Sequence, residues 1–219
     1  MNSLLPHLSP DFFGLLLLGM SVNFEIAAVA LVLGLAVAAP LVLLRLGGGI
    51  AGRIAAALVA LMRAAPTFVV MFFLLNTLPR GLGLTGAMAV SASLVPYAAA
   101  YIADSGVDAM QQLRAGSRLA GLLILPNIAR AFFVMVMSSS AGAAIGVREG
   151  IAVILRQAEQ ARGIGDILLL FAIGIVCFGV PLQAGFAVIR AIQARLGRPA
   201  LPEEEAALTG EATLPAEQV

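Results

Sequence analysis

The sequence contains no lysine, and charged residues occupy only 11% of its 219 positions. A phosphate-binding loop of the Walker A type is therefore excluded, because that loop places a lysine on the phosphates. We expect any ATP hydrolysis to occur in another chain. The remaining composition, with 61% apolar residues and a mean hydropathy of +1.02, also excludes an ordinary water-soluble domain. It is the composition of an integral membrane protein.

Cysteine and histidine are nearly absent, with one residue of each. Cys177 has no partner in the chain, so a disulfide framework is excluded. His7 has no second potential ligand nearby in the sequence, and a metal site needs several. We expect no catalytic residues, no metal site and no bound cofactor in this chain.

Long uncharged apolar runs are abundant. Three of them have 19 to 23 residues, close to the ~20 that a helix needs to cross a bilayer; they are Ile26–Leu44, Gly81–Ala103 and Ile167–Ile189. Two shorter runs, Ala64–Pro79 and Ala131–Val147, can still span if flanking arginines reach the interface. No segment shows the alternation of a membrane β-barrel. The sequence predicts an all-α membrane protein with five transmembrane helices.

The arginines predict how these helices are oriented. With the N-terminus outside, nine arginines fall on one side of the membrane and four on the other. Positively charged loops are retained in the cytoplasm. The N-terminus is therefore expected to be periplasmic and the C-terminus cytoplasmic.

The ends of the chain differ from its apolar centre. Residues 1–21 are expected to form a periplasmic segment, with a break at Pro10 and a short interfacial helix over 12–20. Residues 22–198 are expected to form the five-helix domain, with spans near 22–46, 53–78, 84–110, 124–146 and 167–196. Residues 199–219 are acidic and poor in apolar side chains, which predicts a disordered cytoplasmic tail.

Five short stretches follow one another in a particular order. They are Gly19–Glu25 (GMSVNFE), Leu61–Phe73 (LMRAAPTFVVMFF), Ala99–Asp104 (AAYIAD), Ile124–Asn127 (ILPN) and Ala144–Glu149 (AIGVRE). Each resembles a segment of the permeases of polar amino acid ABC importers, and their order and spacing agree over about residues 12–197. The chain thus resembles the transmembrane subunit of a type I ABC importer.

This resemblance implies a permease that imports amino acids or similar small polar solutes across the bacterial inner membrane. The implied partners are separate ATP-binding cassette subunits that bind the ATP, a periplasmic solute-binding protein, and a second, non-identical permease subunit. Membrane lipid surrounds such a chain, and no nucleic acid is involved. Two alternatives remain: a non-transporting scaffold or regulatory subunit of such a complex, and an unrelated small ion-coupled carrier.

The resemblance is incomplete in the segment expected to contact the ATPase. In the family, a cytoplasmic coupling helix ends in an Ile-x-Leu-Pro pattern, and the run Leu123–Pro126 (LILP) fits this ending. The glutamate and glycine that precede this pattern are not matched in either register. The resemblance implies a shortened coupling contact over residues 108–123, with these candidates: Asp108, Arg114, Gly116, Arg118 and Gly121.

The fourth span also departs from the family. A charged stretch that lines the family's substrate path is replaced by Ser138–Gly142, which implies that this subunit supplies little charged recognition. The candidates for lining the path are Tyr101, Ser138, Ser139 and Ser140. Alternatively, these small residues only allow neighbouring helices to approach closely.

Charges near the spans give two further expectations. Asp104 and Asp108 share one helix face, and we expect them to pair with Arg114 or with a partner's basic residues rather than to catalyse. The nearly charge-balanced segment 148–166 could dock a binding protein, with Arg148, Glu149 and Arg156 as candidates. An amphipathic helix resting at the interface would explain the same charges.

Overall fold

The computed structural model describes residues 9–77, 83, 85–116, 120–161 and 163–196, and within them it is all-helical. The elements are α1 (Pro10–Gly47), α2 (Gly49–Ala64), α3 (Thr67–Thr77), α4 (Gly86–Arg114), α5 (Ala120–Ser138), the 3₁₀ helix η3 (Ser139–Ile145), α6 (Gly150–Glu159) and α7 (Ile164–Leu196). The all-α fold class is thereby confirmed. The acidic tail predicted over 199–219 lies outside the described residues.

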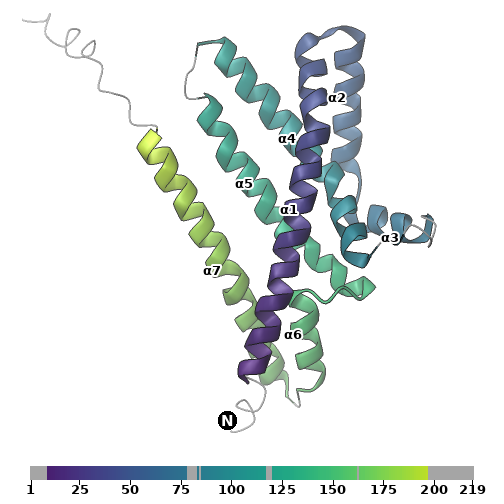
Figure 1. Cartoon of the computed structure of the whole chain (residues 1–219), viewed down its shortest axis with the longest axis vertical. Helices are drawn as coiled ribbons and strands as arrows, with labels where there is room; N and C mark the ends of the chain where they lie inside the picture. The colour runs from purple at the N-terminus through teal and green to yellow at the C-terminus, as the bar shows by residue number, and fades with distance from the viewer. Residues whose placement is uncertain (1–8, 78–82, 84, 117–119, 162, 197–219) are drawn as a thin grey trace, which may run out of the picture.

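Four helical segments are long and apolar enough to cross a membrane: α1, α4, Ile124–Ile145 and α7. The pair α2 and α3 makes a fifth, bent by 91°. Figure 1 shows α1, α2, α4, α5 and α7 running roughly along one axis, with the start of α1 and the end of α7 at opposite ends of the molecule. These elements correspond to the five predicted spans.

Helix α1 is longer than the sequence suggested. Ser9 caps it by accepting a hydrogen bond from the Phe12 amide, and Pro10 occupies the first turn, where its missing N–H costs nothing. From there the helix continues for 38 residues without a break. The separate helix expected over 12–20 is therefore wrong, because Pro10 starts the long helix instead of interrupting it.

The second span is broken at Pro66. Ala65 adopts an extended conformation (φ −69°, ψ 116°), as expected for a residue that precedes proline. Helix α3 then starts in a new direction, which produces the 91° bend. Pro126 behaves differently, since α5 remains helical on both sides of it. Of these two prolines, Pro66 is the one that ends a helix.

Helices α4 and α5 form a hairpin at the expected coupling segment. Helix α4 continues to Arg114, Gly116 turns the chain with a left-handed φ of 93°, and α5 begins at Ala120. Asp108 and Arg114 thus belong to the last turns of α4, and Gly121 to the first turn of α5, while Arg118 lies outside the described residues. Within the described residues, no separate coupling helix stands between the two spans.

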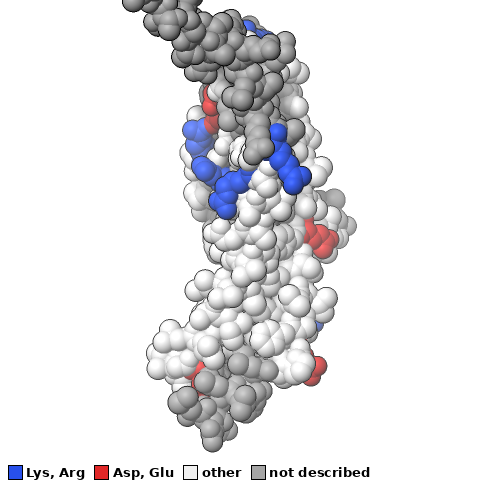
Figure 2. All heavy atoms as spheres, turned by 90° about the vertical axis from the view of Figure 1, so that its left-hand side faces the viewer, with Lys and Arg blue, Asp and Glu red and all other residues white. Residues whose placement is uncertain are grey.

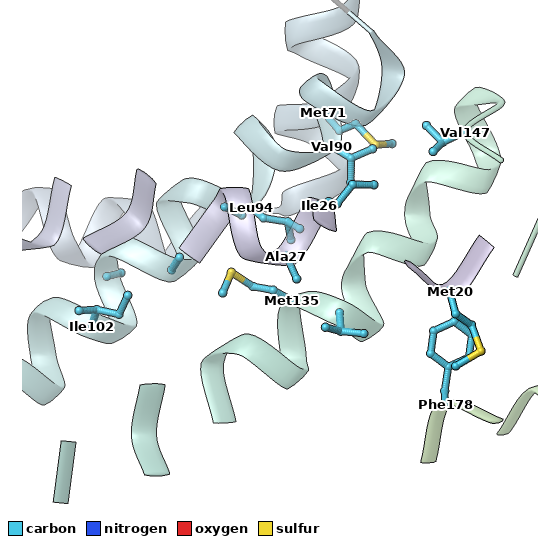
Figure 3. Close-up of a cluster of buried hydrophobic side chains, with 14 of the residues drawn as sticks. Met20, Ile26, Ala27, Met71, Val90, Leu94, Ile102, Met135, Val147 and Phe178 are labelled. Atoms are coloured by element: carbon cyan, nitrogen blue, oxygen red, sulfur yellow. The ribbon is translucent and has the colours of Figure 1, made fainter. Parts of the chain in front are cut away.

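The apolar core lies along α1 and α4. Gly34 of α1 faces Ala98 of α4 so closely that a Cβ on the glycine would lie 2.4 Å from the alanine Cβ. Such close approach between small residues is how membrane helices gain packing contacts. Figure 3 shows that the core extends from these two helices to their neighbours: Met71 of α3 lies near Val90 of α4, and Met20 of α1 lies near Phe178 of α7. The long helices α1 and α4 therefore form the centre of the bundle.

Candidate functional site

A buried polar cluster joins α1 to the segment before α6. Asn23 of α1, which stands between Ser21 and Glu25 in the sequence, is completely buried. Its side-chain amide donates to Ser139 Oγ (2.8 Å) and Glu149 Oε2 (2.9 Å), and its carbonyl oxygen accepts from the Gly150 amide (2.9 Å). One side chain thereby satisfies polar groups of two other segments, η3 and the start of α6, as buried polar groups require.

Glu149 is the acidic member of this cluster and is also completely buried. Its carboxylate caps α6 by accepting hydrogen bonds from the Ile151 and Ala152 amides, both at 2.8 Å. A negative charge at a helix N-terminus is favourable because the free amides there carry partial positive charge. The Glu149 carboxylate and the Asn23 amide together hold the start of α6 against α1.

Burial raises the pKa of the Glu149 carboxyl above its ordinary value of 4.5, although the Ile151 amide, the Asn23 side chain and the Ala152 amide oppose the shift. The folded chain therefore binds this proton more tightly than the unfolded chain does. This tighter proton binding by Glu149 stabilises the folded state fully below pH 4.5, and the stabilisation is lost as the pH rises through the folded-state pKa.

We expect the melting temperature of the wild type to fall as the pH rises over that range. In Glu149→Gln the melting temperature should depend less on pH. Thermal unfolding at several pH values measures this, with Glu159→Gln as an exposed control.

A second charged group lies at the other end of α1. Asp104 of α4 pairs with Arg45 of α1 (2.6 Å) and with Arg63 of α2. Asp104 was expected to pair with Arg114 or with a partner protein, and the expectation is wrong because these two arginines reach it from neighbouring helices. The carboxylate thus connects α1, α2 and α4.

Arginines gather at this end of the molecule. Figure 2 shows the blue side chains toward one end of the face that it views, with a mostly uncharged band beneath them that has an acidic side chain at its right-hand edge. The loops at this end are those between α1 and α2 and between α4 and α5, together with the end of α7. An arginine-rich end is expected on the cytoplasmic side, and the orientation of the chain stays a prediction.

A groove of about 500 Å³ runs between α5 and α7. Its wall is mostly apolar and includes Phe133 and Phe186, whose rings meet edge to face with centroids 4.4 Å apart. Three polar side chains, Arg130, Ser138 and Gln183, also line it. Arg130 has no ion pair within the described part of the chain. The groove can therefore offer a cation, a hydroxyl and an amide to a small polar molecule.

No protein-family model matches the sequence, and no curated protein does. Solved structures do match. One is a crystal structure of an amino acid ABC transporter with histidines, with a TM-score of 0.65 and 17% identity over 84% of this chain and 95% of that one. Another is the inward-facing methionine ABC transporter MetNI, with a TM-score of 0.62 and 19% identity over 84% of this chain and 99% of that one. The chain has the fold of an ABC transporter permease.

The four residues predicted to line the transport path lie in three different places in this fold. Ser138 lines the groove between α5 and α7. Ser139 is buried, where it donates to the Val136 carbonyl and accepts from Asn23, and Ser140 lies at the edge of the same cluster. Tyr101 is half-buried on α4 and stacks on Tyr97. Ser138 is thus the only one of the four that lines this groove.

The three residues predicted to dock a binding protein also differ in their surroundings. Arg148 and Arg156 are exposed and line a groove beside α1. Glu149 points the other way and is buried, so it cannot meet a docking protein, and its prediction as a docking residue is wrong. Its burial follows from its role as the cap of α6, which requires the carboxylate to lie over the helix amides.

Sequence reasoning missed the two residues that matter most for these sites. Asn23 was considered only as part of the resemblance over Gly19–Glu25, and its polar neighbours Ser21 and Glu25 gave no local signal that it would be buried. Arg130 was counted only as a charge on the cytoplasmic side. Its position ten residues into α5, within a helix that spans, was the available signal that it lines a groove.

Proposed function

We propose that the chain is the transmembrane permease subunit of an ABC importer for amino acids or similar small polar solutes. The observation that carries this proposal is the fold likeness, which extends over 95% of the permease chain of an amino acid transporter. Likeness over nearly the whole of that chain supports a comparable role as the membrane subunit. The ATPase, in this proposal, resides in separate ATP-binding cassette subunits.

The groove between α5 and α7 is the proposed contact with the solute. The guanidinium of Arg130 suits the carboxylate of an amino acid, because arginine binds carboxylates through two parallel hydrogen bonds. Ser138 and Gln183 supply the remaining polar groups on this wall. One cation on one side of a path recognises only part of an amino acid. We therefore propose that a second, non-identical permease chain supplies the other charged contacts.

The hairpin between α4 and α5 is the proposed contact with the ATPase. Asp108, Arg114 and Gly116 are all exposed there, at the arginine-rich end. This end would face the cytoplasm, and a periplasmic solute-binding protein would approach the opposite end.

Crosslinking tests this arrangement. In a Cys177→Ser background, which removes the one native thiol, Arg114→Cys places a cysteine at the end of α4. Gln160→Cys places a matched, exposed cysteine just after α6, at the other end of the bundle. After co-expression with a candidate ATP-binding cassette subunit, a short thiol-reactive crosslinker should join that subunit to Arg114→Cys and leave Gln160→Cys unlinked.

The opposite pattern, or no link from either position, would contradict the proposed coupling contact. Co-purification should also yield a second permease chain, and a transporter that is active with this chain alone would exclude the non-identical pair. If the complex transports equally well without this chain, the scaffold alternative is correct instead.

A further inference from the structure

A second groove, of about 500 Å³, lies between the first three turns of α1 and α6. The proposed transport function does not use it. From α1 it is lined by apolar side chains that include Leu15, Leu18 and Val22. From the other side Arg148, Arg156 and Gln160 line it. It thus combines an apolar wall with cationic and amide groups.

The two arginines of this groove are available to a ligand. Both are exposed, and neither forms an ion pair with any described residue. Glu159 lines a smaller cavity on the other side of Arg156 and is not paired with it. By contrast, Arg45 and Arg63 share the carboxylate of Asp104. Two arginines without counterions beside an apolar wall favour an anionic ligand.

The apolar wall is itself uncovered. Leu15 is 58% exposed and Leu18 is 66% exposed. Apolar surface of this kind on a membrane protein is normally covered by lipid or by another protein. A free phosphate would neutralise the arginines and leave the leucines bare, whereas an amphiphile covers both.

The position of the groove along α1 matches the level of the lipid headgroups in a bilayer. A Cβ on Gly19 would lie 2.8 Å from the Gly150 amide nitrogen, so α6 meets α1 at residue 19. From there to Arg45 the helix rises by about 39 Å, at ~1.5 Å per residue. A bilayer measures roughly 40–45 Å when its headgroups are included. If Arg45 marks one boundary, the groove lies at the headgroups of the opposite one.

We propose that this groove binds an anionic phospholipid. Its phosphate lies between Arg148 and Arg156, because guanidinium groups match phosphate oxygens in geometry and charge. One acyl chain lies along Leu15 and Leu18. The proposal is independent of the transport function, since it depends on no residue of the groove between α5 and α7.

The absence of tryptophan from the chain allows a site-specific test. Leu15→Trp introduces a single fluorescent reporter on the groove wall. The full-length protein is reconstituted in phosphatidylcholine vesicles that contain a fixed fraction of either brominated phosphatidylglycerol or brominated phosphatidylcholine. A basic residue near a membrane surface contributes about fivefold to binding of an anionic lipid. We expect the relative binding constant for phosphatidylglycerol, obtained from quenching, to exceed that for phosphatidylcholine by at least about fivefold.

Charge-matched variants localise the effect. Arg148→Gln with Arg156→Gln should reduce the preference to near one, and each single change should reduce it partway. Arg190→Gln with Arg195→Gln removes the same charge from exposed positions at the far end of α7 and should leave the preference unchanged. Reaction of Cys177 with a thiol dye during heating confirms that each variant is folded.

Three results would overturn the proposal. Equal quenching by both lipids, or an unchanged preference in the Arg148/Arg156 double variant, would show that the arginines bind no lipid phosphate. Full competition by soluble glycerol 3-phosphate would show a site for small anions instead. A double variant that keeps its lipid preference but no longer binds the solute-binding protein would make this surface a protein-docking site.

Discussion

Asn23→Leu is expected to destabilise the protein strongly, because it removes all the side-chain hydrogen bonds of a completely buried amide. Leucine has the same number of side-chain heavy atoms, branched at the same carbon, but cannot accept from the Gly150 amide or donate to Ser139 and Glu149. Buried groups left without partners cost roughly 1–3 kcal/mol each, so we expect a loss of about 3 kcal/mol. For a chain of this size that corresponds to roughly 6–12 °C in melting temperature.

The single cysteine supplies the measurement. Cys177 is half-buried in α7, so a thiol-reactive dye reports unfolding of the detergent-solubilised protein. Ser140→Ala is the matched control, because its hydroxyl lies at the limit of hydrogen bonding, 3.5 Å from the Asn23 amide. A shift of less than about 1 °C is expected there, by the scale above. Equal shifts in the two variants would mean that the cluster does not hold α6 to α1.

Gly19→Leu is expected to separate α1 from α6. A Cβ at Gly19 would lie 2.8 Å from both the Glu149 carbonyl carbon and the Gly150 amide nitrogen. These are backbone atoms that cannot rotate away, so the helices must move apart and the Asn23 hydrogen bonds must lengthen. Overpacking of this kind costs about 3 kcal/mol or more. The expected result is a melting temperature lower by about 10 °C, or a protein that does not accumulate.

Gly14→Leu is the chemically matched control for that change. Gly14 lies on the same helix and is exposed, and a Cβ added to it would have no other atom within 4 Å. Replacing a helical glycine there removes a conformational cost of up to about 1 kcal/mol, so stability should be unchanged or slightly higher. If both variants melt at the same temperature, the close packing of α1 on α6 does not contribute to stability.

The spans could be predicted from the sequence because membrane crossing imposes a simple requirement. A helix must present about 20 apolar residues to the hydrocarbon, and that requirement is visible in the runs around α1, α4 and α7. The bend at Pro66 was also predictable, because a proline constrains the residue before it. The start of α1 was not, since a proline ends one helix and begins another with equal ease. Only the cap by Ser9 decides between these outcomes.

The sites were harder to predict than the spans. Ser138, Ser139 and Ser140 are adjacent in sequence, yet the change from α5 to η3 sends Ser138 toward α7 and Ser139 toward α1. Glu149 looked like a surface charge because its neighbours Arg148 and Arg156 are exposed. Its burial depends on Asn23, which is 126 residues away. Contacts over such distances leave no local pattern in the sequence.

The carboxylate of Asp104 has a consequence for motion. By bonding to Arg45 and Arg63 it fastens three helices together at one end, and the close contact of Gly34 with Ala98 fastens two of them again further down. Helix α7 is attached through apolar contacts, such as Gly174 against Ile154 of α6 and Phe186 against Phe133 of α5, and only 17% of its most apolar window is buried. We expect α1, α2 and α4 to move as one rigid unit. Any change between open and closed conformations should then occur mainly by movement of α7.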